Sequence, residues 1–422
     1  MREMKDSGIE WIGQIPNSWT VRRGKTLFVN TKYIPGKLSS NYDRLSLTLK
    51  GVLPRKKDDS DGLQPKDFDT YQLLRKNELV FKLIDLQNVS TSRVGLAHAT
   101  GLVSPAYIVL HANEEILPAF AEKFYLMMWY REIFNSLGDN GVRSSLNVSD
   151  LLNIPVCYPK MEEQIFLTNY LDTKCFEIDA TAEDIQKEID LLEEYKKSVI
   201  TEAVTKGLNP DAEMKDSGVE WIGEIPKHWE IIRIGYILGE IDRRSITGME
   251  ESLSVSQVLG VVPSSQIAVP STASTMVGQK IVEPGELVLN KLKAHLGVCF
   301  VSNYKGLVSP DYAVYKAHEK VKSKLLEYVF HTASCIWEFK KYITGVGQGL
   351  SRLYTKDLFR INVALPDMLE QQQIVSYLDS KCSEIDTLIA DKKRQLDILA
   401  DYKKSLIYEY VTGKKEVPVK DF

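Results

Sequence analysis

The feature that most constrains the fold of this chain is an internal duplication. The segment MKDSG at residues 4–8 returns at residues 214–218, an offset of 210. The blocks Tyr-Leu-Asp and Tyr-Lys-Lys-Ser each occur twice further along, both at an offset of 207. This period is too long for a solenoid repeat, and each copy is as large as a domain. The 422 residues are therefore expected to form one frame repeated twice, with internal pseudo-two-fold symmetry.

The first zone of each copy mixes short β-branched runs with turn residues. It spans residues 15–158 and again 225–365, and its pattern is typical of a mixed α/β domain. The predicted strands are 77–83, 106–110, 285–289 and 312–315, and the predicted helices are 118–137 and 322–343. The copies share little sequence over 30–95 and 240–300. One scaffold would therefore present two different binding surfaces.

The second zone of each copy is a predicted long helix. From 161 to 206 the chain has no Gly or Pro, and apolar residues recur at steps of 3 and 4, as in a heptad seam. Neither helix could bury this stripe alone, so we predict that the two pair as an antiparallel coiled coil. Cys175 and Cys382 lie in the stripe and are expected to be buried, unreactive thiols. The predicted core positions are Leu171, Cys175, Ile178, Ile185, Ile189, Leu192, Leu378, Cys382, Ile385, Ile389, Leu396 and Leu399.

The net charge of −4 conceals an uneven distribution. Residues 15–155 carry +4 and residues 225–362 carry +5, whereas 160–212 carry −7 and 363–422 carry −2. Basic zones are what a phosphate backbone attracts, although a charge of this size is also common on ordinary domains. The distribution is compatible with nucleic acid but does not by itself establish it.

The lack of a recognisable targeting signal and the cysteine usage favour a reducing compartment. There is no apolar run of about 18 residues that would span a membrane and no secretory segment. The five cysteines are odd in number, and none has CxxC spacing. A disulfide framework and a zinc finger are therefore not expected, and the cytoplasm is the predicted location.

The sequence contains no specific catalytic motif. P-loop, HExxH and GxSxG patterns are absent. The glycine cluster at 345–349 follows a predicted helix instead of a strand, so a ligand-contacting loop is expected there more than a phosphate cradle. His331 and Cys335 have i, i+4 spacing, but no second pair joins them as metal ligands. The chain is predicted to be non-catalytic and to bind no metal.

The duplicated order of motifs resembles the specificity (S) subunits of type I restriction-modification systems. The resemblance covers essentially the whole chain, and although each motif alone is modest, their repeated order is specific. The motifs are KDSGxEWIGxIPxxW at 5–19 and 215–229, Val-Ser-Pro at 103–105 and 308–310, EEQ at 162–164 and EQQQI at 370–374, YLDxKCxEID at 170–179 and 377–386, and the two YKKS blocks.

The resemblance implies a non-catalytic DNA reader of the α+β class. Target recognition domains at 1–158 and 213–365 would each read one half of a bipartite site in double-stranded DNA. Conserved helical regions at 159–212 and 366–422 would form the long antiparallel coiled coil that sets the spacing between the halves. Two modification (methyltransferase) subunits and restriction (endonuclease/translocase) subunits would be the partners. S-adenosylmethionine, ATP and magnesium would bind to those partners, and this chain would bind no cofactor.

Candidate DNA contacts are polar or basic residues at strand ends or near glycines in the divergent zones. They would lie on loops that enter the major groove, and contacts of Lys and Arg with phosphates would fix the register of the protein on the DNA. For each of them, a solvated surface position is the alternative. The candidates are Lys82, Gln87, Asn88, Arg93, Arg143, Ser144, Asn290, Lys291, Lys293, Gln348 and Arg352.

Two other functions compete with this interpretation. A stand-alone DNA-modifying enzyme would methylate or cleave DNA without partners. A DNA-independent coiled-coil scaffold would bind random and cognate DNA equally, but it has no evident need for two divergent, basic zones.

Overall fold

The chain divides into two compact units. The computed structural model describes residues 2–55, 68–87, 91–137, 145–267, 276–345 and 351–418. Unit 1 contains Met1–Gln186 and Arg394–Phe422, and unit 2 contains Lys187–Lys393. Each unit therefore holds the globular part of one copy and a segment of both long helices, α4 (Met161–Lys206) and α8 (Met368–Val411). Within the described ranges, no helix is long and apolar enough to cross a membrane.

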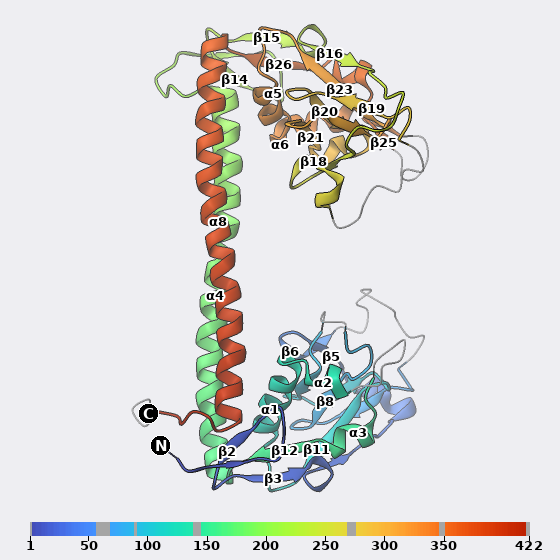
Figure 1. Cartoon of the computed structure of the whole chain (residues 1–422), viewed down its shortest axis with the longest axis vertical. Helices are drawn as coiled ribbons and strands as arrows, with labels where there is room; N and C mark the ends of the chain where they lie inside the picture. The colour runs from blue at the N-terminus through green and yellow to red at the C-terminus, as the bar shows by residue number, and fades with distance from the viewer. Residues whose placement is uncertain are drawn as a thin grey trace. The chain divides into compact units, whose positions relative to one another are not determined.

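Unit 1 is built from short strands with three helices before α4 (Figure 1). The sheet β4-β11-β8-β9 is antiparallel, whereas β6-β5-β10-β7 contains one parallel pair, β5 with β10. β1 pairs with β2, and β3 with β12. The elements are β1 (Met4–Asp6), β2 (Gln14–Pro16), β3 (Thr20–Arg23), β4 (Phe28–Asn30), β5 (Arg44–Thr48), β6 (Gly51–Arg55), β7 (Gln72–Leu74), β8 (Leu79–Phe81), β9 (Val94–Leu96), β10 (Gly101–Val103), β11 (Ile108–Ala112), α1 (Pro118–Tyr130), α2 (Ile133–Leu137), α3 (Val148–Asn153) and β12 (Pro155–Tyr158).

Unit 2 repeats most of these pairings in the same chain order, but the isolated parallel bridge Ser252–Leu307 replaces the β5–β10 pairing, and β24-β25 is additional among the described strands. Its antiparallel sheet is β16-β23-β20-β21, and the further pairs are β13-β14, β15-β26, β17-β18, β19-β22 and β24-β25. The elements are β13 (Met214–Asp216), β14 (Glu224–Pro226), β15 (Glu230–Arg233), β16 (Leu238–Ile241), β17 (Leu253–Ser256), β18 (Gly260–Pro263), β19 (Lys280–Val282), β20 (Leu287–Asn290), β21 (Cys299–Val301), β22 (Gly306–Val308), β23 (Tyr312–Ala317), α5 (Ser323–Phe330), α6 (Ala333–Tyr342), β24 (Thr344–Gly345), β25 (Ser351–Arg352), α7 (Thr355–Leu358) and β26 (Asn362–Leu365).

The two units also share the register of their central strands. Val80 of β8 faces Val109 of β11 in unit 1, and Val288 of β20 faces Val314 of β23 in unit 2. All four side chains are fully buried, as are their neighbours in β8 and β20, so these strands are covered on both faces. The mixed α/β character and the α+β class predicted from the sequence are therefore confirmed.

The two helices predicted before each long helix are wrong in extent, because each is broken. The segment 118–137 forms α1 and α2, separated at Glu132, which adopts a left-handed φ of 58°. The segment 322–343 forms α5 and α6, and Thr332 Oγ1 caps α6 by accepting from Cys335 N (3.3 Å). The helical spacing of apolar residues continues across both breaks, which are changes of the backbone. Because the sequence shows only this spacing, it predicted one continuous helix in each copy.

The repeated motifs fasten each globular part to the first turn of a long helix. In unit 1, Trp19 Nε1 donates to Glu163 Oε1 (3.3 Å), and in unit 2 Trp229 Nε1 donates to Glu370 Oε1 (3.1 Å). Both indoles are almost fully buried. The shared spacing of tryptophan and glutamate in the two copies is therefore a packing requirement.

The residue that follows this glutamate in each long helix is a buried glutamine, which forms hydrogen bonds with three backbone groups. Gln164 Oε1 accepts from Leu117 N (2.7 Å), and its Nε2 donates to the carbonyls of Glu115 (3.0 Å) and Pro159 (2.9 Å). In unit 2, Gln371 makes the same three bonds, to Lys322 N (2.9 Å), Lys320 O (3.1 Å) and Pro366 O (3.0 Å). Each glutamine ties its helix to the loop that precedes α1 or α5.

The predicted helix seam is mostly buried. Eight of the twelve predicted core positions are buried, and Ile185, Leu192, Leu396 and Leu399 are half-buried. In unit 1, Leu171 shares a core with Leu406, and in unit 2 Val199 shares a core with Leu378. Lys392, which interrupts the apolar stripe, forms an ion pair with Glu188 at the partly exposed edge of the seam.

The copies differ at one position near the ends of the long helices. In unit 1, the ring of Tyr410 packs against that of Tyr170, with centroids 4.9 Å apart and planes tilted by 47°. At the matching positions of unit 2, Ala203 stands in place of Tyr410, and Tyr377 is partly exposed. Ala203 and Tyr377 line a pocket of about 760 Å³, the space that the missing ring leaves.

Candidate nucleic-acid interface

Each unit has a site at the ends of its central strands where the copies differ in chemistry, which we call the strand-end site. In unit 1 it is made by Asn30 of β4, the loop after β8, the loop before β11 and the segment leading into α3. Leu146 N donates to Leu83 O (3.0 Å) and holds that segment against the loop after β8. In unit 2 the matching bond runs from Leu353 N to Lys291 O (3.1 Å). Lys291 therefore stands where unit 1 has Leu83.

The strand-end site of unit 1 is small and carries little charge. Asn30 Nδ2 donates to Val109 O (2.8 Å), and Ile84 and Ala106 are exposed at the rim. Among the described residues that line its pocket, Lys32 alone is charged. The pocket has a volume of about 220 Å³ and is lined by Asn30, Lys32, Leu83, Ile84, Pro105, Ala106, Tyr107, Ile108, Leu146, Asn147 and Val148.

The loop after β8 is braced from inside by Arg93. This side chain is fully buried, and its guanidinium donates to the carbonyls of Lys82, Ile84 and Asp85 (2.6–3.5 Å). In this structure the Arg93 guanidinium therefore bonds its own loop, and a DNA contact of Arg93 stays a prediction. Lys82 Nζ donates to Thr91 Oγ1 (3.0 Å), and burial, followed by the nearby Arg93, lowers the pKa of Lys82.

The strand-end site of unit 2 is charged. Lys280 of β19 is almost fully buried, and its ammonium lies 3.3 Å from a Glu240 oxygen and 3.6 Å from an Asp242 oxygen. The Lys291 ammonium lies 4.0 Å from the same Glu240 carboxylate. Burial, followed by the positive charge of Lys280, lowers the pKa of Lys291.

Arg352 and Asp311 complete this site. Arg352 Nη2 lies 3.3 Å from Asp311 Oδ1, and the side chains are 34% and 56% exposed. Asp311 directly follows the repeated Val-Ser-Pro motif, where unit 1 has Ala106. Arg352 precedes Leu353, where unit 1 has Ser145 before Leu146. The ion pair therefore replaces two small side chains at matched positions of the frame.

Asn290 has a structural role that the sequence analysis did not predict. It is buried, and its Oδ1 accepts from the backbone N–H groups of Leu292 (3.1 Å) and Lys293 (3.2 Å). Asn290 thereby caps the 3₁₀ helix that follows β20. Through these bonds Asn290 positions Lys291 and Lys293, and its DNA contact stays a prediction.

The remaining candidates fall into two groups. Gln87 in unit 1 and Lys293 in unit 2 are exposed and stay candidates together with Lys82, Lys291 and Arg352. The candidates Asn88, Arg143, Ser144 and Gln348 lie outside the described residues. The sequence analysis missed Asp311, Glu240 and Lys280, although the change from Ala106 to Asp311 after a repeated motif was a visible signal for the first of these.

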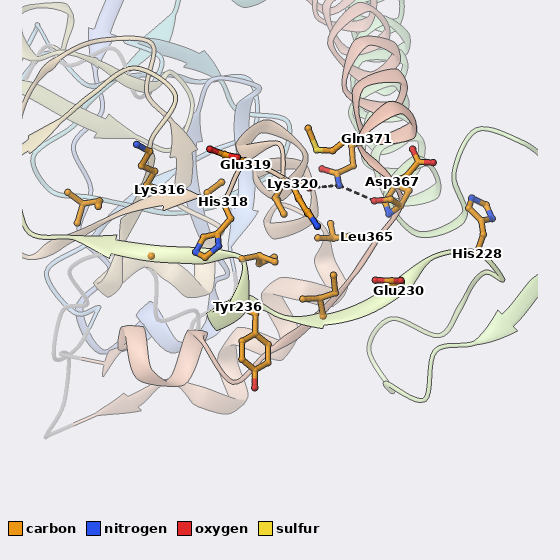
Figure 2. A pocket seen from close by; sticks show the side chains of 18 residues that line it. His228, Glu230, Tyr236, Lys316, His318, Glu319, Lys320, Leu365, Asp367 and Gln371 are labelled. Atoms are coloured by element: carbon orange, nitrogen blue, oxygen red, sulfur yellow. Dashed lines mark hydrogen bonds between the residues drawn. The ribbon is translucent and has the colours of Figure 1, made fainter.

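A further pocket lies in unit 2, beside the start of α8 (Figure 2). It has a volume of about 1060 Å³. Figure 2 shows Gln371 on one side, bonded to the carbonyls of Lys320 and Pro366, and Tyr236 and His318 on the other. Its floor is apolar, with Ile237 and Leu365 buried.

The matched surface of unit 1 is bridged by polar bonds. Arg22 Nη1 lies 3.1 Å from Glu115 Oε1, and Tyr158 Oη donates to Glu115 Oε2 (2.9 Å). At these positions unit 2 has Ile232, Lys320 and Leu365, so no equivalent bridge can form. The pocket of unit 2 thus results from the loss of one ion-pair bridge. Among the described residues, no three His, Cys, Asp or Glu side chains are grouped to hold a metal ion.

Comparison with known proteins finds relatives of one kind. No protein-family model matches the chain. It is 23% identical over 431 aligned residues to a putative type I restriction enzyme MjaX specificity subunit of Methanocaldococcus jannaschii, with 96% of both chains covered. The chain is a homologue of type I restriction enzyme specificity subunits. The resemblance inferred from the repeated motifs is therefore confirmed.

Two further relatives agree with this assignment. The type I restriction enzyme MjaVIII specificity subunit of the same organism is 24% identical over 281 residues, which cover 63% of each chain. A chain solved in work on complex assembly and conformational transition of the type I R-M system has a TM-score of 0.69 at 14% identity. That match covers 95% of this chain and 99% of the other, so the two chains share a fold over nearly their whole lengths.

Proposed function

We propose that this chain is the sequence-specific DNA-binding subunit of a type I restriction-modification complex and reads a bipartite target. Unit 1 would read one half-site and unit 2 the other. The observation that carries the proposal is the pair of strand-end sites. They occupy the same place in one repeated frame, yet the described lining of one has a single charged side chain, whereas the other contains several ion pairs. A duplicated frame with two unlike sites is what a target of two unlike halves requires.

The spacing between the half-sites would be set by the long helices. Lys403 Nζ lies 2.6 Å from Asp179 in unit 1, and Lys196 Nζ lies 2.6 Å from Asp386 in unit 2. In unit 1, Tyr170 and Asp179 of α4 meet Tyr410 and Lys403 of α8 in the reverse order. These contacts support an antiparallel coiled coil and a pseudo-two-fold relation of the copies, in which each lysine of one copy meets an aspartate of the other.

The domain boundaries and partners follow from the same proposal. Recognition domains at 1–158 and 213–365 alternate with helical regions at 159–212 and 366–422. Two methyltransferase subunits would dock on the duplicated frame, and restriction subunits would join them. S-adenosylmethionine, ATP and magnesium would act on those subunits, and this chain would contribute no catalytic group. The DNA contacts would come from Lys82 and Gln87 in unit 1 and from Lys291, Lys293 and Arg352 in unit 2.

Methylation mapping of the host genome tests the proposal. In cells that carry the chain we expect methylation at one bipartite motif, and deletion of the chain alone should abolish it. Restoring the chain on a plasmid is the control. Persistence of the motif after deletion would refute the proposed role. Methylation or cleavage of DNA by the purified chain alone would favour an enzyme, and equal binding of random and cognate DNA by the assembled complex would favour a scaffold.

A further inference from the structure

We propose that the Asp311–Arg352 ion pair of unit 2 reads one G·C base pair in the half-site of that unit. This inference rests on the proposed function and adds to it the chemical identity of a base pair. It concerns the described part of the strand-end site alone, namely Asp311 and Arg352 with their neighbours Glu240, Asp242, Lys280 and Lys291.

The pair is held by backbone bonds on both sides. Asp311 N donates to Ser309 Oγ (3.3 Å) in the turn after the Val-Ser-Pro motif. Arg352 pairs with Thr344 across the β24-β25 hairpin, and the next residue, Leu353, donates its N–H to Lys291 O (3.1 Å). Because the carboxylate also orients the guanidinium, Arg352 presents its donors in a fixed direction while a third of its surface stays accessible. Fixed donors are what base readout needs.

The charge of the site distinguishes a base edge from a phosphate. Three carboxylates, Glu240, Asp242 and Asp311, lie among its cations, which are Lys280, Lys291, Arg352 and the Asp242 partner Arg244. A phosphate favours unmatched positive charge, and the carboxylates would repel it. The major-groove edge of a G·C pair instead offers acceptors on guanine O6 and N7 beside a donor on cytosine N4. An arginine paired with an aspartate supplies the complementary donors and acceptor at one place.

Unit 1 provides an internal comparison. At the matched positions it has Ala106 and Ser145, and its strand-end site is a pocket of about 220 Å³ in which Lys32 alone among the described lining residues is charged. A guanine-reading arginine has no counterpart there among the described residues. The inference therefore assigns this G·C pair to the half-site of unit 2 and leaves the half-site of unit 1 to a different readout.

The test is selection of bound sequences from randomised duplex DNA by the full chain, assembled with its methyltransferase subunits. Wild type should enrich a bipartite motif. Arg352→Gln should lower discrimination for guanine at one position of one half-site by roughly 5- to 150-fold, and adenine should gain there, because glutamine bonds adenine N6 and N7. Asp311→Ala should relax the same position. Arg360→Gln is the matched control, since Arg360 also pairs with an aspartate, Asp357, at 3.5 Å on an exposed surface of unit 2.

The outcomes separate this inference from the proposed function. If wild type enriches a bipartite motif but Arg352→Gln leaves both half-sites unchanged, the inference is overturned and the proposed function stands. It is likewise overturned if Arg352→Gln weakens all sequences uniformly, which would mark a phosphate contact. If wild type enriches no motif, the proposed function fails and this inference falls with it. A change at one position of one half-site, absent in Arg360→Gln, supports both.

Discussion

Replacing Gln371 by alanine should loosen unit 2 and leave unit 1 unchanged. The Gln371 side chain is only 2% exposed and bonds Lys322 N, Lys320 O and Pro366 O at 2.9–3.1 Å. Alanine removes all three bonds and leaves the three backbone groups without a partner from this side chain. The perturbation therefore acts where the loop before α5 meets the first turn of α8.

The expected cost follows from these three bonds. A typical intramolecular hydrogen bond contributes about 1 kcal/mol net, and a buried group left without its partner costs about 1–3 kcal/mol. Lys320 is exposed, so water can reach part of the site and the lower values apply there. We expect a loss of about 3 kcal/mol in the stability of unit 2, a substantial part of the total for a domain of this size.

Amide hydrogen exchange of the full chain, followed by mass spectrometry, resolves the two units. Gln371→Ala should lower the opening free energy of slowly exchanging amides in unit 2, and Gln164→Ala should do the same in unit 1. Gln372→Ala is the control, because Gln372 is exposed and bonds only Ser376, at 3.2 Å. A loss below about 1 kcal/mol in unit 2, or an equal loss in both units, would refute the reasoning.

Three further predictions concern the long helices and the thiols. Ala203→Tyr should place a ring beside Tyr377 and raise stability by about 1 kcal/mol, seen as a higher urea midpoint; a lower midpoint would mean that the pocket does not admit the ring. The five cysteines are buried, and burial raises the pKa of Cys157 to about 12, so little thiolate exists at pH 8. A thiol reagent should react slowly with the native chain, whereas in denaturant it should label all five cysteines. Rapid labelling of the native chain would contradict their burial. Asp386→Ala should remove the partly exposed Lys196 ion pair at a cost of less than about 1 kcal/mol, and the cost should shrink further in 1 M salt; a cost unaffected by salt would count against an electrostatic origin.

The sequence predicted the frame well because the frame is repeated. Motifs such as the Trp19–Glu163 and Trp229–Glu370 pairs are the same in both copies, so they were recognisable before their contacts were known. Helix breaks were not predictable in this way. The positive φ of Glu132 leaves no mark on the apolar period, since the hydrophobic pattern records which face is buried and not whether the backbone continues.

The strand-end sites were predictable only in part, because they differ between the two copies. Polar residues at strand ends serve either the ligand or the backbone, and the sequence does not distinguish these uses. Arg93 and Asn290 bond the backbone of their own loops, whereas Arg352 remains accessible. Asp311 was visible as a difference between copies but not as a partner for Arg352, because the two residues are 41 positions apart.

The division of the chain into units has a consequence for its synthesis. Unit 2 is continuous, but unit 1 needs Arg394–Phe422 to complete it. At about 5–20 residues per second, the ribosome finishes the chain roughly 10–50 s after Gln186 is made. During that interval Leu167 and Leu171 of the nascent α4 lack Leu406 and Ile407, which share their core in the finished unit. The part made first is thus the last to close, and it exposes an apolar helix face to chaperones and to neighbouring nascent chains in the meantime.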